Sequence, residues 1–321
     1  MENSMKILFM GTPDFAVASL QTLLEQGYEI AAVVTQPDRP KGRKRELTPT
    51  PVKAFALERG LEVLQPEKLR SPEGVAAVTT IAPDIIVTAA YGQILPKAIL
   101  ELPRLGCINV HGSLLPRYRG GAPIQRSIID GETVTGVTLM YMAEGLDTGD
   151  MIAKVEVPIT DEDTAGSMFG KLSVAGAKLL TEWLPRIADG TAGRTPQNND
   201  EATYAPNLTR EDEKLIWSQD ARKLFNRVRG LNPMASGFTY LDGEVFKVWS
   251  CRIPQGSDTM MRPEWTSLLP GSVLESGAFG IRVRTGDGSI VLTEVQPAGK
   301  KALAAAEFAK GARLAPGKVL G

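Results

Sequence analysis

Strand and helix patterns alternate through roughly the first two hundred residues, and this alternation constrains the fold more than any other feature. Short apolar, β-branched runs predict strands, and most of them are followed by a segment whose apolar residues have helical spacing. Strands separated by helices form right-handed crossovers, which produce a mainly parallel, doubly wound sheet. The expected strands are Lys6–Met10, Ile30–Thr35, Glu62–Leu64, Asp84–Ala89 and Gly106–His111, followed by Val134–Met142 and Met151–Val157.

The helices between these strands have recognisable starts. Thr12 is expected to cap the first helix, with Pro13 at its first position, because a threonine hydroxyl satisfies free N–H groups and proline fits the first turn. Two further helices are expected to begin near Pro51 and Pro72. A long amphipathic helix is expected over 164–184.

The composition changes between Asp189 and Thr209, where Gly, Thr, Asn, Pro and Asp interrupt the apolar spacing. Such a stretch indicates a linker. Beyond it, one short helix over 221–229 and several short strands with little other helix favour a small barrel. The expected strands there are Gly237–Leu241, Val245–Cys251, Gly271–Leu274, Gly280–Arg284 and Ile290–Gln296.

The chain of 321 residues is long enough for two domains at about 150 residues each. We therefore predict an α/β domain at 1–189 with a doubly wound, mainly parallel sheet. A linker is expected at 190–207, and a small OB-like β-barrel domain at 208–321.

Cysteine and histidine counts exclude several kinds of site. The two cysteines, Cys107 and Cys251, are too far apart in the sequence for a CxxC pair, and His111 is the only histidine. Zinc sites with several histidines are therefore impossible, and we expect no metal. No apolar run approaches the ~20 residues that span a membrane, and the first residues do not form a secretory signal. The expected location is the cytoplasm.

The first strand-to-helix turn argues against nucleotide cofactors. A dinucleotide site needs GxGxxG there, whereas this turn reads GTPDFA, with Pro13 and Phe15 in place of the features that admit a pyrophosphate. The phosphate loop GxxxxGK[ST] of nucleotide hydrolases does not occur either. Use of NAD is therefore not expected.

The fifth strand carries the first candidates for chemistry. In GCINVHGSLLP, residues 106–116, Asn109 and His111 point to one face while Ile108 and Val110 point to the other. The strand then opens into a loop at its carboxyl end, where open α/β sheets bind ligands. A single histidine at a strand end is also compatible with a purely structural role.

An acidic turn supplies a partner for this pair. Residues 144–150, EGLDTGD, follow a predicted strand, so their carboxylates can reach the same edge of the sheet, although an ordinary hairpin turn has the same composition. A carboxylate near His111 favours the charged imidazolium. An amide, an imidazole and a carboxylate suit an acyl-type transfer, in which two donors stabilise an oxyanion and the carboxylate helps to move a proton.

A cluster of positive charge lies between the second strand and the next helix, in QPDRPKGRKRELTPT, residues 36–50. Pro and Gly predict that this segment is a loop. Such a run of charge is often only a solvated face. This segment begins at the same edge of the sheet as the candidate site. In addition, the chain beyond position 207 carries a net charge of +4, whereas the part before it carries −5. Both features are compatible with a polyanionic partner. The cluster consists of Arg39, Lys41, Arg43, Lys44 and Arg45.

The motifs GTPDFA, QPDRPKGR, NVHGSLLPRYRGGAP and EGLDTGDM, in this order, resemble the methionyl-tRNA formyltransferase family nearly from end to end. The resemblance implies a formyltransferase-like Rossmann variant followed by an OB-like barrel. It also implies transfer of the formyl group of 10-formyltetrahydrofolate, a co-substrate, to the amino group of methionine on initiator tRNA.

Carried onto this sequence, the resemblance makes Asn109 and His111 the oxyanion-stabilising pair and Asp147 the catalytic carboxylate, whereas the nearby Asp150 matches no functional position. It implies that the cationic cluster enters the acceptor stem of the tRNA, with Arg43 at its most exacting position. The protein is expected to act as a monomer. The implied folate contacts are Ser113, Leu114, Leu115, Pro116, Gln93, Ile94 and Leu95.

Three other functions are compatible with parts of the sequence. A folate-dependent formyltransferase acting on a small amine, such as a nucleotide sugar or glycinamide ribonucleotide, would share the Asn109, His111 and Asp147 set. A formyltetrahydrofolate dehydrogenase or hydrolase would share it too, but no aldehyde dehydrogenase portion is present. An RNA-binding module without enzymatic activity would explain the cationic cluster and the barrel while leaving that set unused.

Overall fold

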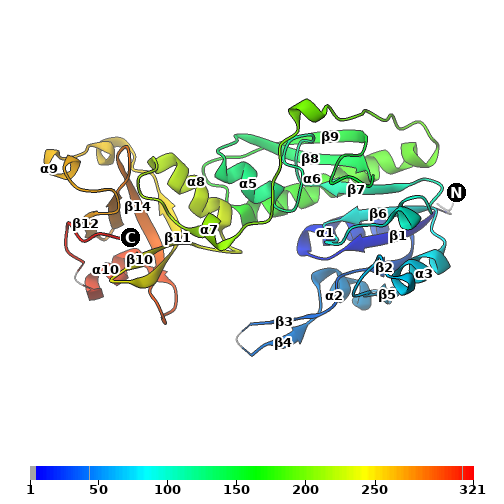
Figure 1. The fold of residues 1–321 in the computed structure, drawn as a ribbon, viewed down its shortest axis with the longest axis horizontal. Coiled ribbons are helices and arrows are strands. Elements are labelled where there is room, and N and C mark those ends of the chain that lie inside the picture. The colour runs from blue at the N-terminus through cyan, green and yellow to red at the C-terminus, as the bar shows by residue number, and fades with distance from the viewer. Residues whose placement is uncertain (1–4, 43, 313) are drawn as a thin grey trace. The chain divides into compact units, whose positions relative to one another are not determined.

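The computed structural model describes residues 5–42, 44–312 and 314–321 (Figure 1). They form two compact units. The first unit is built from Met1–Pro123, Val134–Pro158 and Phe169–Pro206, and the second from Ile124–Thr133, Ile159–Met168 and Asn207–Gly321. Two segments that precede the predicted linker therefore belong to the second unit, so no single point in the sequence separates the units.

The first unit contains a seven-stranded sheet with the order β5-β2-β1-β6-β7-β8-β9. The pairs from β5 to β7 are parallel, whereas β7, β8 and β9 pair antiparallel. This arrangement confirms the predicted mainly parallel sheet. The strands are β1 (Lys6–Gly11), β2 (Glu29–Val34), β5 (Val63–Leu64), β6 (Ile85–Ala89), β7 (Cys107–His111), β8 (Val134–Tyr141) and β9 (Met151–Pro158).

Helices connect these strands, and their caps follow the sequence except at the first turn. Thr50 and Ser71 cap the second and third helices with their hydroxyls. The prediction for the first helix is wrong by one residue, because Pro13 occupies the cap position and Thr12 donates its hydroxyl to the Tyr91 carbonyl (2.8 Å) instead. The helices are α1 (Asp14–Glu25), α2 (Pro51–Glu58), α3 (Pro72–Ile81), α4 (Lys97–Leu100), α5 (Pro123–Ile129) and α6 (Ala165–Ala188).

The long helix α6 covers one face of the sheet beneath β7. At Gly176 of α6, an added Cβ would lie 2.7 Å from Val110 and 3.4 Å from Val137, so the absence of a side chain lets the helix approach the strands closely. Because side chains alternate along a strand, Asn109 and His111 are on the opposite face of β7. The sheet therefore presents this pair away from α6.

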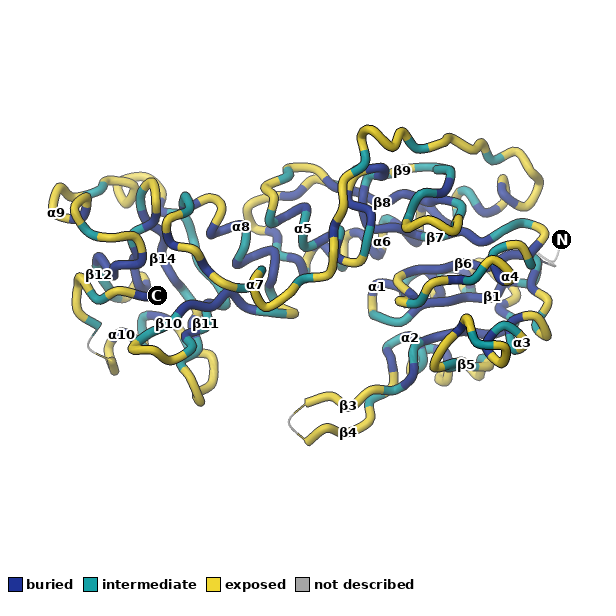
Figure 2. The backbone as a smooth tube through the Cα atoms, viewed as in Figure 1, coloured by how far each residue is buried: buried dark blue, intermediate teal, exposed yellow. Residues whose placement is uncertain are grey.

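A short antiparallel hairpin replaces the loop that was expected around the cationic cluster. It consists of β3 (Arg39–Lys41) and β4 (Glu46–Thr48), and it is largely exposed (Figure 2). Asp38 anchors its base by accepting hydrogen bonds from Lys53 (2.7 Å) and Gln65 (2.8 Å). These two bonds lower the pKa of the Asp38 carboxyl.

The second unit is rich in strands, as predicted. A sheet with the order β10-β11-β14-β13-β12, extended by β15 on β14, packs its apolar residues against α8 (Ala221–Leu231) and α10 (Ala305–Ala312). No helix in the described ranges is long and apolar enough to cross a membrane. The strands are β10 (Gly237–Leu241), β11 (Glu244–Arg252), β12 (Val273–Gly277), β13 (Gly280–Arg284), β14 (Ser289–Gln296) and β15 (Leu303–Ala304), and the short helices are α7 (Arg210–Glu213) and α9 (Pro263–Thr266).

Candidate functional site

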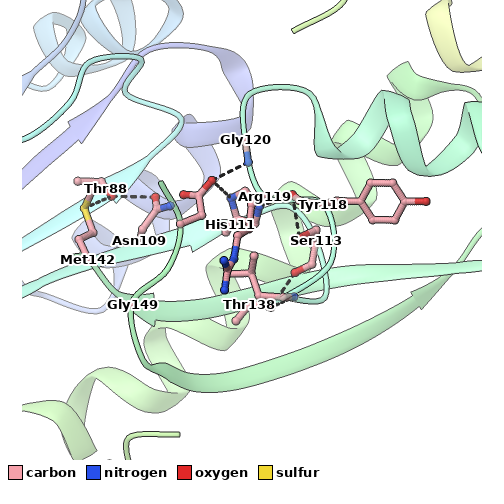
Figure 3. Close-up of polar contacts among 12 residues, drawn as sticks. Thr88, Asn109, His111, Ser113, Tyr118, Arg119, Gly120, Thr138, Met142 and Gly149 are labelled. Carbon is pink, nitrogen blue, oxygen red and sulfur yellow. Dashed lines mark hydrogen bonds and ion pairs between the residues drawn. The ribbon is translucent and has the colours of Figure 1, made fainter. Parts of the chain in front are cut away.

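Asn109 is held in one orientation by the neighbouring strand. Thr88 of β6 lies directly beside it in the parallel ladder, and the Thr88 hydroxyl is 2.8 Å from Asn109 Oδ1 (Figure 3). Because an amide oxygen accepts and the hydroxyl donates, this bond leaves the NH₂ group of Asn109 free to donate to a ligand. Thr88 was not predicted as a site residue, although its position near the end of the adjacent strand was a usable signal.

The ring of His111 is fixed by a backbone carbonyl. Its Nε2 lies 2.9 Å from the Tyr118 oxygen, and the side chain is 7% exposed. A carbonyl only accepts, so Nε2 carries a hydrogen, and the neutral ring presents an unprotonated Nδ1. Nδ1 is therefore the nitrogen whose protonation can change during a reaction.

Asp147 faces that nitrogen. Its Oδ2 lies 3.8 Å from His111 Nδ1 and accepts a hydrogen bond of 2.8 Å from the Gly120 backbone N–H. The distance of 3.8 Å is beyond hydrogen-bonding range, so Asp147 faces Nδ1 without forming a direct hydrogen bond to it. The structure thus brings the predicted His111 and Asp147 together.

The backbone of the acidic turn is specialised for this placement. Asp147 has φ of +50°, a left-handed conformation that is uncommon for residues with a side chain. At Gly149 an added Cβ would come within 1.7 Å of the Tyr141 oxygen. Glycine is therefore required where the turn passes against β8.

The loop after β7 is a rigid frame built from Ser113 to Pro116. Thr138 of β8 donates to the Ser113 oxygen (2.7 Å) and accepts from the Leu115 N–H (3.0 Å), and Lys154 donates to the Leu115 oxygen. Ser113, Leu115 and Pro116 are buried, and Leu114 is half-buried. The side chains proposed for folate contact thus mostly point inward, which leaves backbone groups and Leu114 as the accessible part.

The three side chains of Gln93–Leu95 differ in exposure, since Gln93 is half-buried, Ile94 is exposed and Leu95 is buried. Gln93 accepts from the Leu69 N–H (2.7 Å) and donates toward Gln36 (3.1 Å), so its amide is engaged within the protein. Leu95 is 4% exposed in the apolar core, whereas Ile94 is 77% exposed. Of the three, Ile94 has the accessible apolar surface that suits a flat ligand ring.

The cationic cluster lies on the β3–β4 hairpin. Arg39 forms an exposed ion pair with Glu67 (3.3 Å), and Lys41, Lys44 and Arg45 are exposed; Arg43 is outside the described residues. The hairpin follows β2, whose carboxyl end lies at the same edge of the parallel sheet as that of β7. The predicted proximity of the cluster to the edge that carries Asn109 and His111 therefore agrees with the topology.

Two further kinds of reactive group are a metal-binding cluster and a thiol such as that of Cys107. Within residues 5–42, 44–312 and 314–321, no group of His, Cys, Asp and Glu side chains is arranged to hold a metal ion. Burial raises the pKa of the Cys107 thiol to about 12. A thiol in that state is a poor nucleophile, because the reactive form is the thiolate.

Sequence comparisons match both parts of the chain to one family. A family model described as "Formyl transferase" matches residues 5–184, and one described as "Formyl transferase, C-terminal domain" matches residues 207–313. Many relatives match as well, and those with about half of their residues identical share nearly the full length of the chain.

Two relatives and one solved structure illustrate these similarities. Methionyl-tRNA formyltransferase of Geobacillus thermodenitrificans (strain NG80-2) is 53% identical, with 98% of this chain and 97% of that protein aligned. The protein of the same name from Bacillus subtilis (strain 168) is 52% identical, with 98% of each chain aligned. The crystal structure of HypX from Aquifex aeolicus in complex with tetrahydrofolic acid is 18% identical with a TM-score of 0.64, over 96% of this chain and 47% of that chain, and so shares the fold.

Proposed function

Since this chain belongs to the methionyl-tRNA formyltransferase family, we propose that it transfers the formyl group of 10-formyltetrahydrofolate to the free amino group of methionyl initiator tRNA. The observation that carries the proposal is the arrangement of His111 between the Tyr118 carbonyl and the Asp147 carboxylate. That arrangement gives an acyl-transfer site its charged donor and its proton acceptor.

In the proposed reaction, the amine nitrogen attacks the formyl carbon and the formyl oxygen becomes an oxyanion. Asn109 donates from its NH₂ group and His111 donates from protonated Nδ1 to this oxyanion. Each such donor is worth about 3–4 kcal/mol of barrier when it is aimed at the charge that develops in the transition state. Transfer is direct, with no covalent intermediate on the protein.

Asp147 carries the proton that the amine loses to N10 of the folate in the proposed reaction. The amine loses one proton as its bond to carbon forms, and Asp147 accepts it directly or through water. The bond from the formyl carbon to N10 of the folate then breaks, and N10 receives that proton. The side chains of the site end in the protonation state in which they began.

We assign the cationic hairpin to the acceptor stem of the tRNA. Lysine and arginine side chains bind phosphates without reading sequence, and β2 leads from the sheet edge of the site into this hairpin. All three catalytic side chains come from one chain, which supports a monomeric enzyme. The proposed substrate also supports a cytoplasmic location, where translation is initiated.

The decisive experiment is a formyl-transfer assay with 10-formyltetrahydrofolate and three acceptors: charged initiator methionyl-tRNA, charged elongator methionyl-tRNA and small amines, including an amino sugar nucleotide. We expect kcat/KM for initiator tRNA to exceed the other values by at least tenfold. Faster transfer to a small amine, or no transfer to any acceptor, would exclude the proposed function.

A further inference from the structure

Part of the segment expected to be a linker is attached to the catalytic unit. Residues 195–205, which we call the linker strap, lie between the two parts of the chain that the family models match. Thr195 exchanges two backbone hydrogen bonds with Met151 at the start of β9 (2.8 and 2.9 Å). Further along, Arg119 N–H donates to the Thr203 oxygen (2.9 Å), and Ala205 N–H to the Arg119 oxygen (2.6 Å). The strap is therefore attached at its start to β9 and near its end to Arg119.

One side chain of the strap reaches the turn that carries Asp147. Nε2 of Gln197 donates to the backbone oxygens of Asp147 (2.7 Å) and Gly149 (2.8 Å), and Oε1 of Gln197 accepts from Arg119 Nε (3.1 Å) and Nη2 (2.9 Å). These four bonds use both donors and both acceptor positions of the amide. Gln197 thus clamps the acidic turn on both sides of Thr148.

Arg119 fixes which way this amide faces. The arginine is 2% exposed, and its Nη2 also donates to Asn199 Oδ1 (2.9 Å). A guanidinium only donates, so the oxygen of Gln197 must face Arg119 and its NH₂ must face the turn. Buried Arg119 therefore keeps the NH₂ group of Gln197 directed at the backbone oxygens of Asp147 and Gly149, to which it donates.

The same strap supports the residue that orients His111. Thr203 accepts a hydrogen bond from Tyr118 N–H (2.9 Å), and the Tyr118 oxygen accepts from the imidazole. Both the imidazole and the carboxylate of the site are thus held through groups that contact the strap. Asp147, with its φ of +50°, needs such support, because a left-handed non-glycine residue persists where surrounding structure holds it.

We propose that Gln197 is a positioning residue of the active site, which holds the Asp147 turn in the geometry needed for proton transfer. This inference rests on the proposed function, because it assigns Gln197 an effect that passes through Asp147. A merely structural tie would instead change stability or substrate binding without coupling to Asp147.

The test combines Gln197→Met with Asp147→Asn in the full-length protein and measures kcat and KM for initiator tRNA and folate. Methionine matches the size of glutamine and removes all four hydrogen bonds, and misplacing a catalytic group by about 1 Å can cost ~10²-fold in rate. We expect Gln197→Met to lower kcat 10- to 100-fold while both KM values stay within twofold. The double variant should be no more than twofold slower than Asp147→Asn, because residues that act as a unit are not additive.

Two further variants keep the test decisive. Gln197→Glu keeps an acceptor for Arg119 but turns a carboxylate toward two carbonyl oxygens, so it should lose kcat even if Gln197→Met does not fold. Asn198→Ala is the matched control, because Asn198 is exposed and its side chain accepts from Asp200 N–H of its own segment. We expect this control to retain the wild-type kcat.

The outcomes separate this inference from the proposed function. Three results would overturn the positioning role, even if the wild type formylates initiator tRNA and Asp147→Asn is much slower. They are losses that multiply in the double variant, an unchanged kcat in folded Gln197→Met or Gln197→Glu, and a loss confined to KM. Full activity of Asp147→Asn would instead remove the catalytic assignment of Asp147, and this inference with it.

Discussion

His111 combines two contacts that differ in kind. The Tyr118 carbonyl fixes the hydrogen on Nε2 at 2.9 Å, whereas Asp147 faces Nδ1 from 3.8 Å. The first contact sets the tautomer, and the second places a carboxylate near Nδ1 at a distance beyond hydrogen bonding. The imidazole is thereby left with one nitrogen that can donate to a reacting oxygen.

Replacing His111 with asparagine tests this role. The shorter amide keeps polarity but loses the cationic donor, so we expect kcat to fall by ~10²–10³-fold, the usual cost of one oxyanion donor. The Kd for charged tRNA, measured by filter binding, should stay within twofold. A His111→Asn protein that turns over at the wild-type rate would show that the imidazole does not contact the oxyanion.

Thr88→Val tests whether the orientation of Asn109 matters. Valine is close to threonine in shape but cannot donate to Asn109 Oδ1, so the amide can rotate and its NH₂ is no longer directed outward. We expect kcat to fall about fivefold, since one neutral hydrogen bond contributes about 1 kcal/mol. Thr80→Val is the control, because Thr80 is exposed on α3 and its hydroxyl donates to Ala76 O of the same helix. This variant should show no loss.

At this scale, the sequence indicated candidate groups for chemistry more readily than the residues that hold them. Asn109 and His111 lie on one face at the end of β7, and the family resemblance singled out Asp147, which the structure places 3.8 Å from His111. Gln197 was not recognisable, because its role depends on a contact with a turn about fifty positions earlier. Gln93 shows the converse, since its polar side chain serves the interior.

At the scale of elements, the β3–β4 hairpin projects the cationic cluster on a defined two-stranded support. The sequence predicted the charges and their place after β2 but not the strands, because Pro and Gly in the segment are typical of loops. Pairing of Arg39 with Thr48 and of Lys41 with Glu46 forms the hairpin nonetheless. The side chains of Lys41, Lys44 and Arg45 are exposed on this hairpin.

Removing positive charge from the hairpin should weaken tRNA binding in a salt-dependent way. For a Lys41→Ala, Lys44→Ala variant we expect a higher KM for charged tRNA with kcat nearly unchanged. The slope of log KM against log salt should decrease by about one for each phosphate that the hairpin no longer neutralises. Lys178→Ala, on the exposed side of α6, is the control. An unchanged KM and slope in the hairpin variant would dissociate this element from the RNA.

At the scale of the whole molecule, the second unit combines its C-terminal part with two segments that come earlier in the sequence. Residues 159–168 lie far before 207 in sequence, yet Arg229 of α8 donates to the backbone oxygens of Thr160 (2.6 Å) and Asp163 (3.1 Å). Composition predicted a linker at 190–207, whereas the first unit extends to Pro206. Composition also could not show this return of an earlier segment, because a nonlocal contact leaves no local pattern. Arg229 is 8% exposed, so the contact is part of a packed interior.

Arg229→Met should therefore destabilise the protein more than the loss of a surface arginine does. The substitution removes the donor to the Asp163 oxygen and to Asn226 Oδ1 (3.0 Å) in a buried setting, and depriving buried acceptors of their partner costs ~1–3 kcal/mol each. We expect the free energy of unfolding in urea to fall by about 3 kcal/mol. Arg222→Met is the matched control, because Arg222 is half-exposed and pairs with exposed Asp161, and such surface pairs contribute about 0–1 kcal/mol. Equal losses in the two variants would mean that Arg229 does not bind the earlier segment into the second unit.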